Sequence, residues 1–369
     1  MSTRTLLIIF VVVFALGLFL IVILPFLLGA GPASPRSGAD ERGPQALADQ
    51  GVFRSDDGGR TWQQKTFVEG EAGSIAGFRV NRVIPHPTNA AAMFLATDGS
   101  GLWVSESRGD LWAPVIDGAG VLDPRSNVLD IAVNPANGEE WYVAVFQGER
   151  GRVFRSADGG ETFAEVYATP AERFGVFAVR FDPRRGTVLV ATGHGGLLES
   201  ADQGRTWRVV RWFAEGLLEL LINPTSPAAR YVVTPRGNVF RSLDAGVSWS
   251  DVSPALREFS GATLNQRWVL DRAGTLSLGS HRGLLRSTDQ GATFAEVPLI
   301  FPPSVVSVLA VAVDPQHASR VVVAAGGQLY RSDDGGSRWA ILPPPSQKRI
   351  THLLIDGENS ETIYAVAQP

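Results

Sequence analysis

A short motif recurs seven times along this chain, and its spacing limits the fold to a repeat architecture. The pattern is Ser-x-Asp-x-Gly-x-Thr-aromatic, and its serines follow one another at intervals of 42 to 51 residues from Ser55 to Ser332. The second copy is degraded, with Ser107 where the others carry aspartate. The six aspartates are Asp57, Asp158, Asp202, Asp244, Asp289 and Asp334. A fixed period near this length predicts stacked supersecondary units, typically the blades of a β-propeller.

Each repeat is predicted to contain four strands, and the two ends of the repeat region complement one another. The region begins at Gly51 with what corresponds to a third strand, whereas residues 350–355 and 362–366 correspond to a first and a second strand. Pairing these halves in one blade removes the exposed edges of an open array. We therefore expect an all-β, seven-bladed propeller over residues 51–369, closed by a blade shared between N- and C-terminal strands.

The repeated motif itself is expected to have a structural role. It falls on the hairpin between third and fourth strands, where a buried aspartate would accept hydrogen bonds from backbone N–H groups and from the Ser and Thr hydroxyls. The alternative is a calcium loop, but calcium takes six to eight oxygen ligands and most copies supply one carboxylate. The chain has no cysteine, and its five histidines fall in five different units. No metal site and no cofactor is predicted.

These repeats resemble the Asp-box (BNR) repeats of sialidase-like propellers. Seven blades behind an N-terminal hydrophobic segment resemble the photosystem II stability/assembly factor family, over about residues 51–369. That resemblance implies a non-catalytic role in assembling a membrane protein complex. Seven-bladed Asp-box modules also form endoglucanases, which pair two propellers. Because many activities share this fold, the resemblance is specific for architecture and poor for function.

The N-terminal segment is predicted to be a membrane anchor. Residues 6–30 contain no charged side chain and, as a helix, would exceed the roughly 30 Å hydrocarbon core of a bilayer. The alternatives are a cleaved signal peptide and a buried core helix. Residues 1–5 would be a cytoplasmic tail and residues 31–50 a flexible linker. We expect a single-pass protein of the cell membrane, with its propeller on the extracytoplasmic side.

Net charge argues against one class of partner. The 33 basic and 37 acidic side chains give a formal charge of −4, so no global attraction to nucleic acid is expected.

The inner strands carry a better candidate for a binding site. Asn/Asp-Pro turns follow most first strands, and five residues before the proline position the seven blades present Arg82, Asp130, Ala178, Glu219, Arg267, Ala310 and His352. Five of these seven are polar in strands that are otherwise apolar. Because innermost strands flank the channel, these side chains are predicted to meet at its mouth. The alternative is a hydrated, self-neutralising ring without a ligand.

Loops on the same face add further candidates. Ligands of related propellers bind opposite the Asp boxes, which puts Arg150, Arg236, His281 and Arg282 on the binding side. No catalytic residue is assigned, because Asp130 and Glu219 are the only carboxylates of the ring and a glycosidase needs a suitably spaced pair. The sequence favours a membrane-anchored scaffold or assembly factor that binds another membrane protein. A glycan-binding or glycoside-hydrolysing protein is the alternative.

Overall fold

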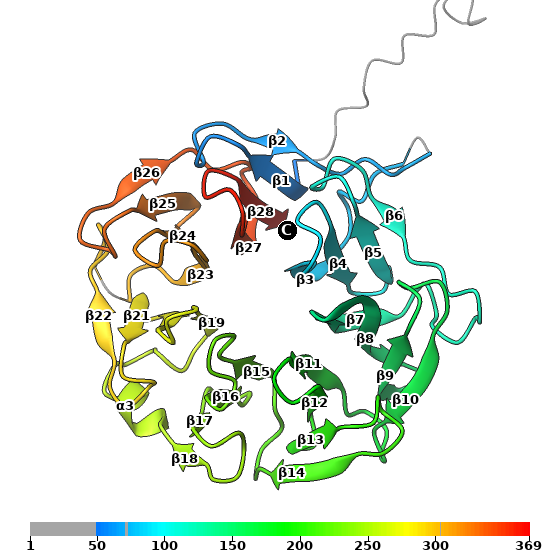
Figure 1. The fold of residues 1–369 in the computed structure, drawn as a ribbon. Coiled ribbons are helices and arrows are strands. Elements are labelled where there is room, and N and C mark those ends of the chain that lie inside the picture. Colours follow the sequence, from blue (N-terminus) through cyan, green and yellow to red (C-terminus); the bar gives the residue numbers. More distant parts are fainter. Residues whose placement is uncertain (1–48, 71–72, 303) are drawn as a thin grey trace, which may run out of the picture. The chain divides into compact units, whose positions relative to one another are not determined.

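The structure is a computed structural model that describes residues 49–70, 73–302 and 304–369. In these residues, strands β1 to β28 form seven four-stranded antiparallel sheets arranged around a central axis (Figure 1). The seven-bladed β-propeller predicted from the repeats is confirmed. One short helix of the described chain, α3 (Ser253–Arg257), lies in the connection between the fifth and sixth blades.

Blades 2 to 7 each take four consecutive strands, running from the channel outward. Blade 2 consists of β3 (Val80–Pro85), β4 (Met93–Thr97), β5 (Leu102–Ser105) and β6 (Ala113–Pro114). Blade 3 consists of β7 (Asn127–Asn134), β8 (Asn137–Gln147), β9 (Arg150–Ser156) and β10 (Ala164–Ala168). Blade 4 consists of β11 (Val176–Asp182), β12 (Thr187–Thr192), β13 (Gly196–Ser200) and β14 (Arg208–Trp212). Blade 5 consists of β15 (Glu219–Ile222), β16 (Arg230–Val233), β17 (Val239–Ser242) and β18 (Ser250–Asp251). Blade 6 consists of β19 (Arg267–Leu270), β20 (Leu276–Gly279), β21 (Leu284–Ser287) and β22 (Ala295–Val297). Blade 7 consists of β23 (Val308–Val313), β24 (Val321–Ala325), β25 (Gln328–Ser332) and β26 (Ala340–Leu342).

Blade 1 closes the ring with strands from both ends of the described chain. Its sheet has the order β2-β1-β28-β27, built from β1 (Gly51–Ser55), β2 (Gln63–Gln64), β27 (Arg349–Ile355) and β28 (Ile363–Gln368). Val52 of β1 is opposite Val366 of β28, and the Ser346 hydroxyl donates to the Asp49 carbonyl oxygen at 2.8 Å. The predicted shared blade is therefore confirmed.

The core lies between neighbouring blades. Alternate side chains of a strand point to opposite faces of its sheet. In β12, Val190 packs in a cluster with Tyr142 of blade 3, whereas Leu189 packs in a cluster with Leu220 of blade 5. Both faces of the second strand are therefore buried, which explains its continuous apolar sequence.

The Asp-box hairpins have the predicted hydrogen bonds but a different buried residue. In blade 4, the Ser200 hydroxyl donates to Asp202 Oδ1 and accepts from the Gly204 N–H, both at 2.8 Å. Asp202 in turn accepts from the Thr206 N–H at 2.9 Å and from its hydroxyl at 2.6 Å. The serine is buried and the aspartate is only partly so, which corrects the expectation of a buried aspartate.

Hydrogen bonds from Thr206 and Ser200 lower the pKa of Asp202 to about 2, so this carboxylate is ionised at neutral pH. In the degraded second copy, the Ser107 hydroxyl oxygen accepts the Leu111 N–H at 2.9 Å in place of the missing carboxylate. A hydroxyl oxygen therefore replaces the carboxylate as hydrogen-bond acceptor at this position of the hairpin.

No helix of the described residues is long and apolar enough to cross a membrane. The predicted tail (residues 1–5), the predicted anchor (6–30) and the predicted linker up to residue 48 lie outside the described residues.

Candidate binding site at the channel mouth

The innermost strands enclose a cavity of about 1320 Å³ along the propeller axis. Asp-box hairpins join third and fourth strands and so mark one face of the ring; each inner strand begins at the opposite face, which we call the ligand face. The ring positions predicted from sequence lie near the starts of these strands. Six of the seven line the cavity: Arg82, Asp130, Glu219, Arg267, Ala310 and His352.

A β-bulge makes these positions structurally equivalent. In β3 the register shifts between Val80 and Arg82, so Asn81 is the extra residue and Arg82 follows it. The inner strands of blades 3, 4, 7 and 1 have the same shift directly before their ring residue. In blades 5 and 6 the strand starts at the ring residue itself. Bulges bend a strand and re-aim its side chains, which here sets the direction of the ring residues.

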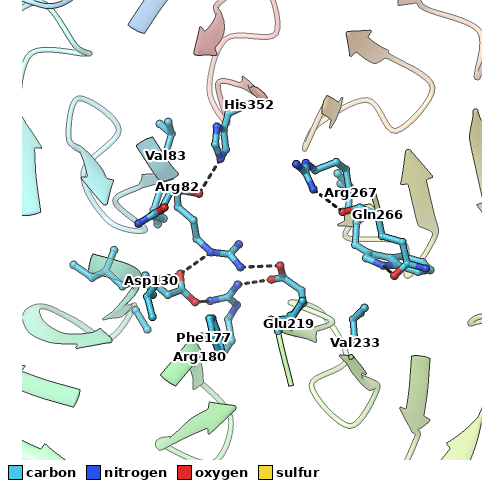
Figure 2. Close-up of a pocket in the computed structure, with 18 of the residues that line it drawn as sticks. Arg82, Val83, Asp130, Phe177, Arg180, Glu219, Val233, Gln266, Arg267 and His352 are labelled. Carbon is cyan, nitrogen blue, oxygen red and sulfur yellow. Dashed lines mark hydrogen bonds and ion pairs between the residues drawn. The ribbon is translucent and has the colours of Figure 1, made fainter. Parts of the chain in front are cut away.

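Four charged side chains from four different blades form a closed network across part of the channel (Figure 2). The Arg82 Nη2 atom lies 2.7 Å from Glu219 Oε2, and its Nε atom lies 3.5 Å from Asp130 Oδ1. Arg180 Nη2 lies 3.0 Å from Glu219 Oε1, and Arg180 Nη1 contacts Asp130 Oδ2. Two guanidinium groups and two carboxylates thus alternate, and their charges cancel.

Arg180 is a member of this network that sequence alignment on the ring positions missed. It lies two residues after Ala178, on the same face of β11, and takes the place that the small Ala178 leaves. The sequence did contain a sign of it, because Arg180 is a charged residue flanked by the apolar Val179 and Phe181 in the interior of the strand.

The ion pairs of the network outweigh the effect of burial on the charges of Glu219 and Arg82. Desolvation would raise the pKa of Glu219, but the guanidinium groups of Arg82 and Arg180 outweigh it and lower that pKa. Burial lowers the pKa of Arg82, and the charges of Glu219 and Asp130 reverse this into a net rise. Asp130 is only 1% exposed and also accepts the N–H groups of Ile131 and Val179. The lowered pKa favours the ionised form of Glu219.

His352 sits beside this network in its neutral form. Burial lowers the pKa of His352 to about 4, and the charges of Arg267 and Arg82 add to the effect. Its Nε2 atom lies 2.8 Å from the Asn81 carbonyl oxygen, and its Nδ1 atom lies 3.0 Å from the Thr351 hydroxyl. This geometry fits the tautomer in which Nε2 carries the proton and donates to Asn81.

Arg267 is the cation of the mouth that the network does not use. Its Nη1 atom donates to the Gln266 carbonyl oxygen at 2.9 Å, and no acidic side chain of the described chain forms an ion pair with it. Burial and the neighbouring Arg349 lower its pKa. Figure 2 shows Arg267 across the cavity from Asp130. Ala310 of the next blade lines the same cavity with only a methyl group.

The predicted loop residues are not part of this site. Arg150 pairs with Glu172 at 3.5 Å, and Arg282 pairs with Glu296 at 2.9 Å. The other two contact neighbouring loops: Arg236 lies 3.9 Å from Glu215, and His281 Nδ1 lies 2.9 Å from the Ser307 hydroxyl. None of the four lines the central cavity.

The two carboxylates of the network are engaged by arginines and, at Asp130, by backbone N–H groups. A glycoside hydrolase needs one carboxyl group with a raised pKa as proton donor. Glu219 has a lowered pKa, and Asp130 is occupied by two N–H groups and two arginines. Across residues 49–70, 73–302 and 304–369, no three His, Asp or Glu side chains are grouped to hold a metal ion.

Comparison with known proteins supports the repeat assignment. Residues 53–64 match the BNR/Asp-box repeat family. An oligoxyloglucan-reducing end-specific xyloglucanase of Emericella nidulans is 27% identical over 201 residues, which is 48% of this chain and 24% of that protein. A xyloglucanase of a Paenibacillus species is 28% identical over 254 residues, or 64% of this chain and 22% of that protein. The matched region thus spans less than a quarter of each relative.

Solved structures share the fold. The GH74 xyloglucanase from Xanthomonas campestris has a TM-score of 0.62 at 21% identity, covering 83% of this chain and 52% of that one. The structure of YCF48 bound to D1 peptide has a TM-score of 0.60 at 15% identity, covering 79% of this chain and 95% of that one. At these identities the likeness concerns architecture. The chain is an Asp-box propeller whose fold is shared by YCF48 as well as by the GH74 xyloglucanase.

Proposed function

We propose that this protein is a membrane-anchored, non-catalytic propeller that binds an acidic peptide segment of another membrane protein at its channel mouth. In this role it acts as a scaffold or assembly factor for a membrane protein complex. The observation that carries the proposal is Arg267, which lines the cavity and forms no ion pair within the described residues, beside a network in which Arg82 and Arg180 are paired with Glu219 and Asp130. A guanidinium group of this kind favours carboxylate ligands.

The comparison with the YCF48 structure supports the class of ligand. The structural match covers 95% of the YCF48 chain, which was solved bound to D1 peptide. Its 15% identity to this chain carries the fold alone, so the peptide ligand is transferred here only as a proposal.

The test uses the full-length protein in mild detergent and a fluorescein-labelled Gly-Ser peptide that ends in acidic residues. We expect R267Q to weaken binding of this peptide by about tenfold, the loss of one charge-assisted contact. Arg236→Gln is the matched control, because Arg236 lies on the same face but outside the cavity. Equal binding by R267Q and the unaltered protein would overturn the proposal, as would equal binding of a basic peptide.

Affinity purification from native membranes then asks which partner carries such a segment. Co-elution of a stoichiometric integral membrane protein is expected. Recovery of the protein alone would count against a scaffold.

The proposal includes a single-pass anchor at residues 6–30, a cytoplasmic N-terminus and an extracytoplasmic propeller. The uncharged length of that segment supports it. Because the chain has no cysteine, Ala214→Cys would provide a single thiol on the exposed ligand face. Labelling of this thiol in intact cells by a membrane-impermeant maleimide is expected, and labelling only after lysis would contradict the orientation.

A glycan-binding or glycan-cleaving function is the second candidate, because both curated relatives are xyloglucanases. Its weakness is the absence of a proton-donating carboxyl in the described channel. Xyloglucan oligosaccharides separate the two candidates: measurable hydrolysis that Glu219→Gln abolishes would favour the enzyme.

A further inference from the structure

Aromatic rings gather on the ligand face around blade 4, outside the charged network. Phe174, from the connection between blades 3 and 4, stacks on His194, with ring centroids 3.5 Å apart and an interplanar angle of 23°. Phe177 lies in β11 at the wall of the channel, and Trp212 ends β14. We call these four side chains the aromatic ridge.

Glycines beneath the ridge hold two of its rings against the backbone. A Cβ atom added at Gly193 would lie 2.9 Å from Phe177 Cε2, and one at Gly196 would lie 2.8 Å from Trp212 Cζ3. Both distances are shorter than normal carbon contacts. The Gly193 N–H donates to the Gly175 carbonyl oxygen at 2.8 Å, which joins the two loops under the ridge. The absence of a side chain at these two glycines therefore lets the rings of Phe177 and Trp212 lie directly against the backbone.

The ridge is accessible and continuous with the channel mouth. Trp212 is 53% exposed, and the other three rings are partly exposed. Phe177 lines the central cavity next to Arg180, as Figure 2 shows. Rigid, exposed aromatic side chains cost little conformational entropy on binding and are enriched where binding energy concentrates.

The charges beside the ridge indicate which occupant it fits. Arg173 and Arg211 adjoin Phe174 and Trp212 in sequence, are exposed, and have no ion pair in the described residues. Of the acidic residues on these loops, Glu172 is paired with Arg150 and Glu215 accepts from Asn238 at 2.8 Å. Glu149 is the one acidic side chain without an ion pair, against two such arginines. The ridge thus combines apolar area with surplus positive charge.

We propose that the aromatic ridge is a side-chain subsite for a peptide that carries an aromatic or aliphatic residue close to an acidic one. This subsite rests on the proposed function, because the same peptide would continue into the channel mouth at Arg267. The ridge would supply selectivity for the apolar side chain, whereas the mouth would supply attraction for the carboxylate. A neutral sugar ring would also stack on these rings but gains nothing from the unpaired guanidinium groups.

The experiment compares three fluorescein-labelled probes on the full-length protein: an acidic Gly-Ser peptide with one Phe, the same peptide with Ala in its place, and the Phe peptide with Lys replacing the acids. We expect the acidic Phe probe to bind about tenfold more tightly than the acidic Ala probe. Trp212→Ala and Phe174→Ala should each reduce that advantage to about twofold without changing the affinity for the acidic Ala probe. Phe67→Ala is the matched control, because Phe67 is 47% exposed in the connection between blades 1 and 2.

Each outcome decides between the ridge and the mouth. An advantage of Phe over Ala that survives in both ridge variants, or no advantage at all, would overturn the ridge. Equal binding of the Lys probe would remove the acidic part of the proposal. If R267Q weakens binding of both acidic probes equally while the ridge variants have no effect, the proposed site at the channel mouth is supported and the proposed subsite at the ridge is refuted. Binding of xyloglucan oligosaccharide that Trp212→Ala abolishes, without any peptide binding, would overturn both proposals.

Discussion

Arg82 and Glu219 belong to blades 2 and 5, are separated by 137 residues in sequence, and meet at 2.7 Å across the channel of the propeller. This ion pair joins blades that share no sheet and are not neighbours in the ring. With Asp130 and Arg180 it ties four consecutive blades together at their inner edges. The polar centre of the ring is therefore a structural connection as well as a boundary of the candidate site.

Removing the negative charge of Glu219 should affect both stability and binding. Glu219→Gln would leave Arg82 and Arg180 with one carboxylate between them, and we expect the free energy of unfolding to fall by about 1–3 kcal/mol. The same change should increase affinity for the acidic probe, since two arginines gain unpaired charge. Urea unfolding and fluorescence anisotropy measure the two effects. Glu172→Gln is the control, because that side chain is 58% exposed and has one partner at 3.5 Å; a similar loss in both variants would refute the network.

The buried serine of each Asp box should contribute to stability, although the hairpin that carries it lies at the surface of the propeller. Ser200→Ala removes the acceptor of the buried Gly204 N–H, and we expect a loss of about 1–3 kcal/mol in unfolding free energy with no change in ligand affinity. Ser250→Ala, at an exposed position of blade 5, should change stability by less than about 0.5 kcal/mol. Thermal melts of both variants check this, and an unshifted melt for Ser200→Ala would remove the capping role.

The lowered pKa of the buried His352 predicts that the protein is less stable at acidic pH. Burial lowers the pKa of His352 to about 4 from a usual value of 6.5, so between these values the unfolded chain binds a proton that the folded chain does not. Stability contributed by neutral His352 is therefore complete above pH 6.5 and is lost as pH falls toward 4. Denaturant unfolding at pH 7 and pH 5 should show a smaller change for His352→Gln than for the unaltered protein. His317→Gln, at a 64% exposed position, should behave like the unaltered protein.

Close packing of the connecting loops gives a prediction about one glycine. A Cβ atom at Gly216 would lie 2.4 Å from the Gly193 carbonyl oxygen, a backbone atom that cannot rotate away. Gly216→Ala should therefore destabilise the protein by about 1–3 kcal/mol and weaken binding of the acidic Phe probe, because Gly193 underlies the ridge. Gly357→Ala has no atom within 4 Å of its added Cβ. If its melting temperature falls as far as that of Gly216→Ala, the steric explanation is wrong.

Much of the fold and part of the site were predictable from the sequence, for different reasons. The repeats and the strands at both ends predict the number of blades and the shared blade, because each repeat carries the sequence pattern of one four-stranded blade. The Asn/Asp-Pro turns also locate ring residues, since in blades 3, 4 and 7 the turn lies a fixed distance after the bulge that precedes the ring residue. Arg180 was missed because it occupies a different row of the same strand face, two residues after Ala178.

The ion pairs between different blades could not be predicted from the sequence. Which carboxylate Arg82 meets depends on how long side chains extend across a channel, and no local pattern encodes that distance. The ridge was missed for a related reason: Phe177 and Trp212 resemble ordinary core residues until the glycines beneath them place their rings at the surface.

Closure of the ring has a consequence for the synthesis of the chain. Asp56 and Thr362 hydrogen-bond across the shared blade at a sequence separation of 306 residues. At a translation rate of roughly 5–20 residues per second, the hairpin of β1 and β2 would wait about 15–60 s for its partner strand to leave the ribosome. During that interval the nascent arc has an unpaired edge at each end, the kind of surface that joins one chain to another. The late synthesis of β28 therefore prolongs the time for which the edge of β1 is exposed.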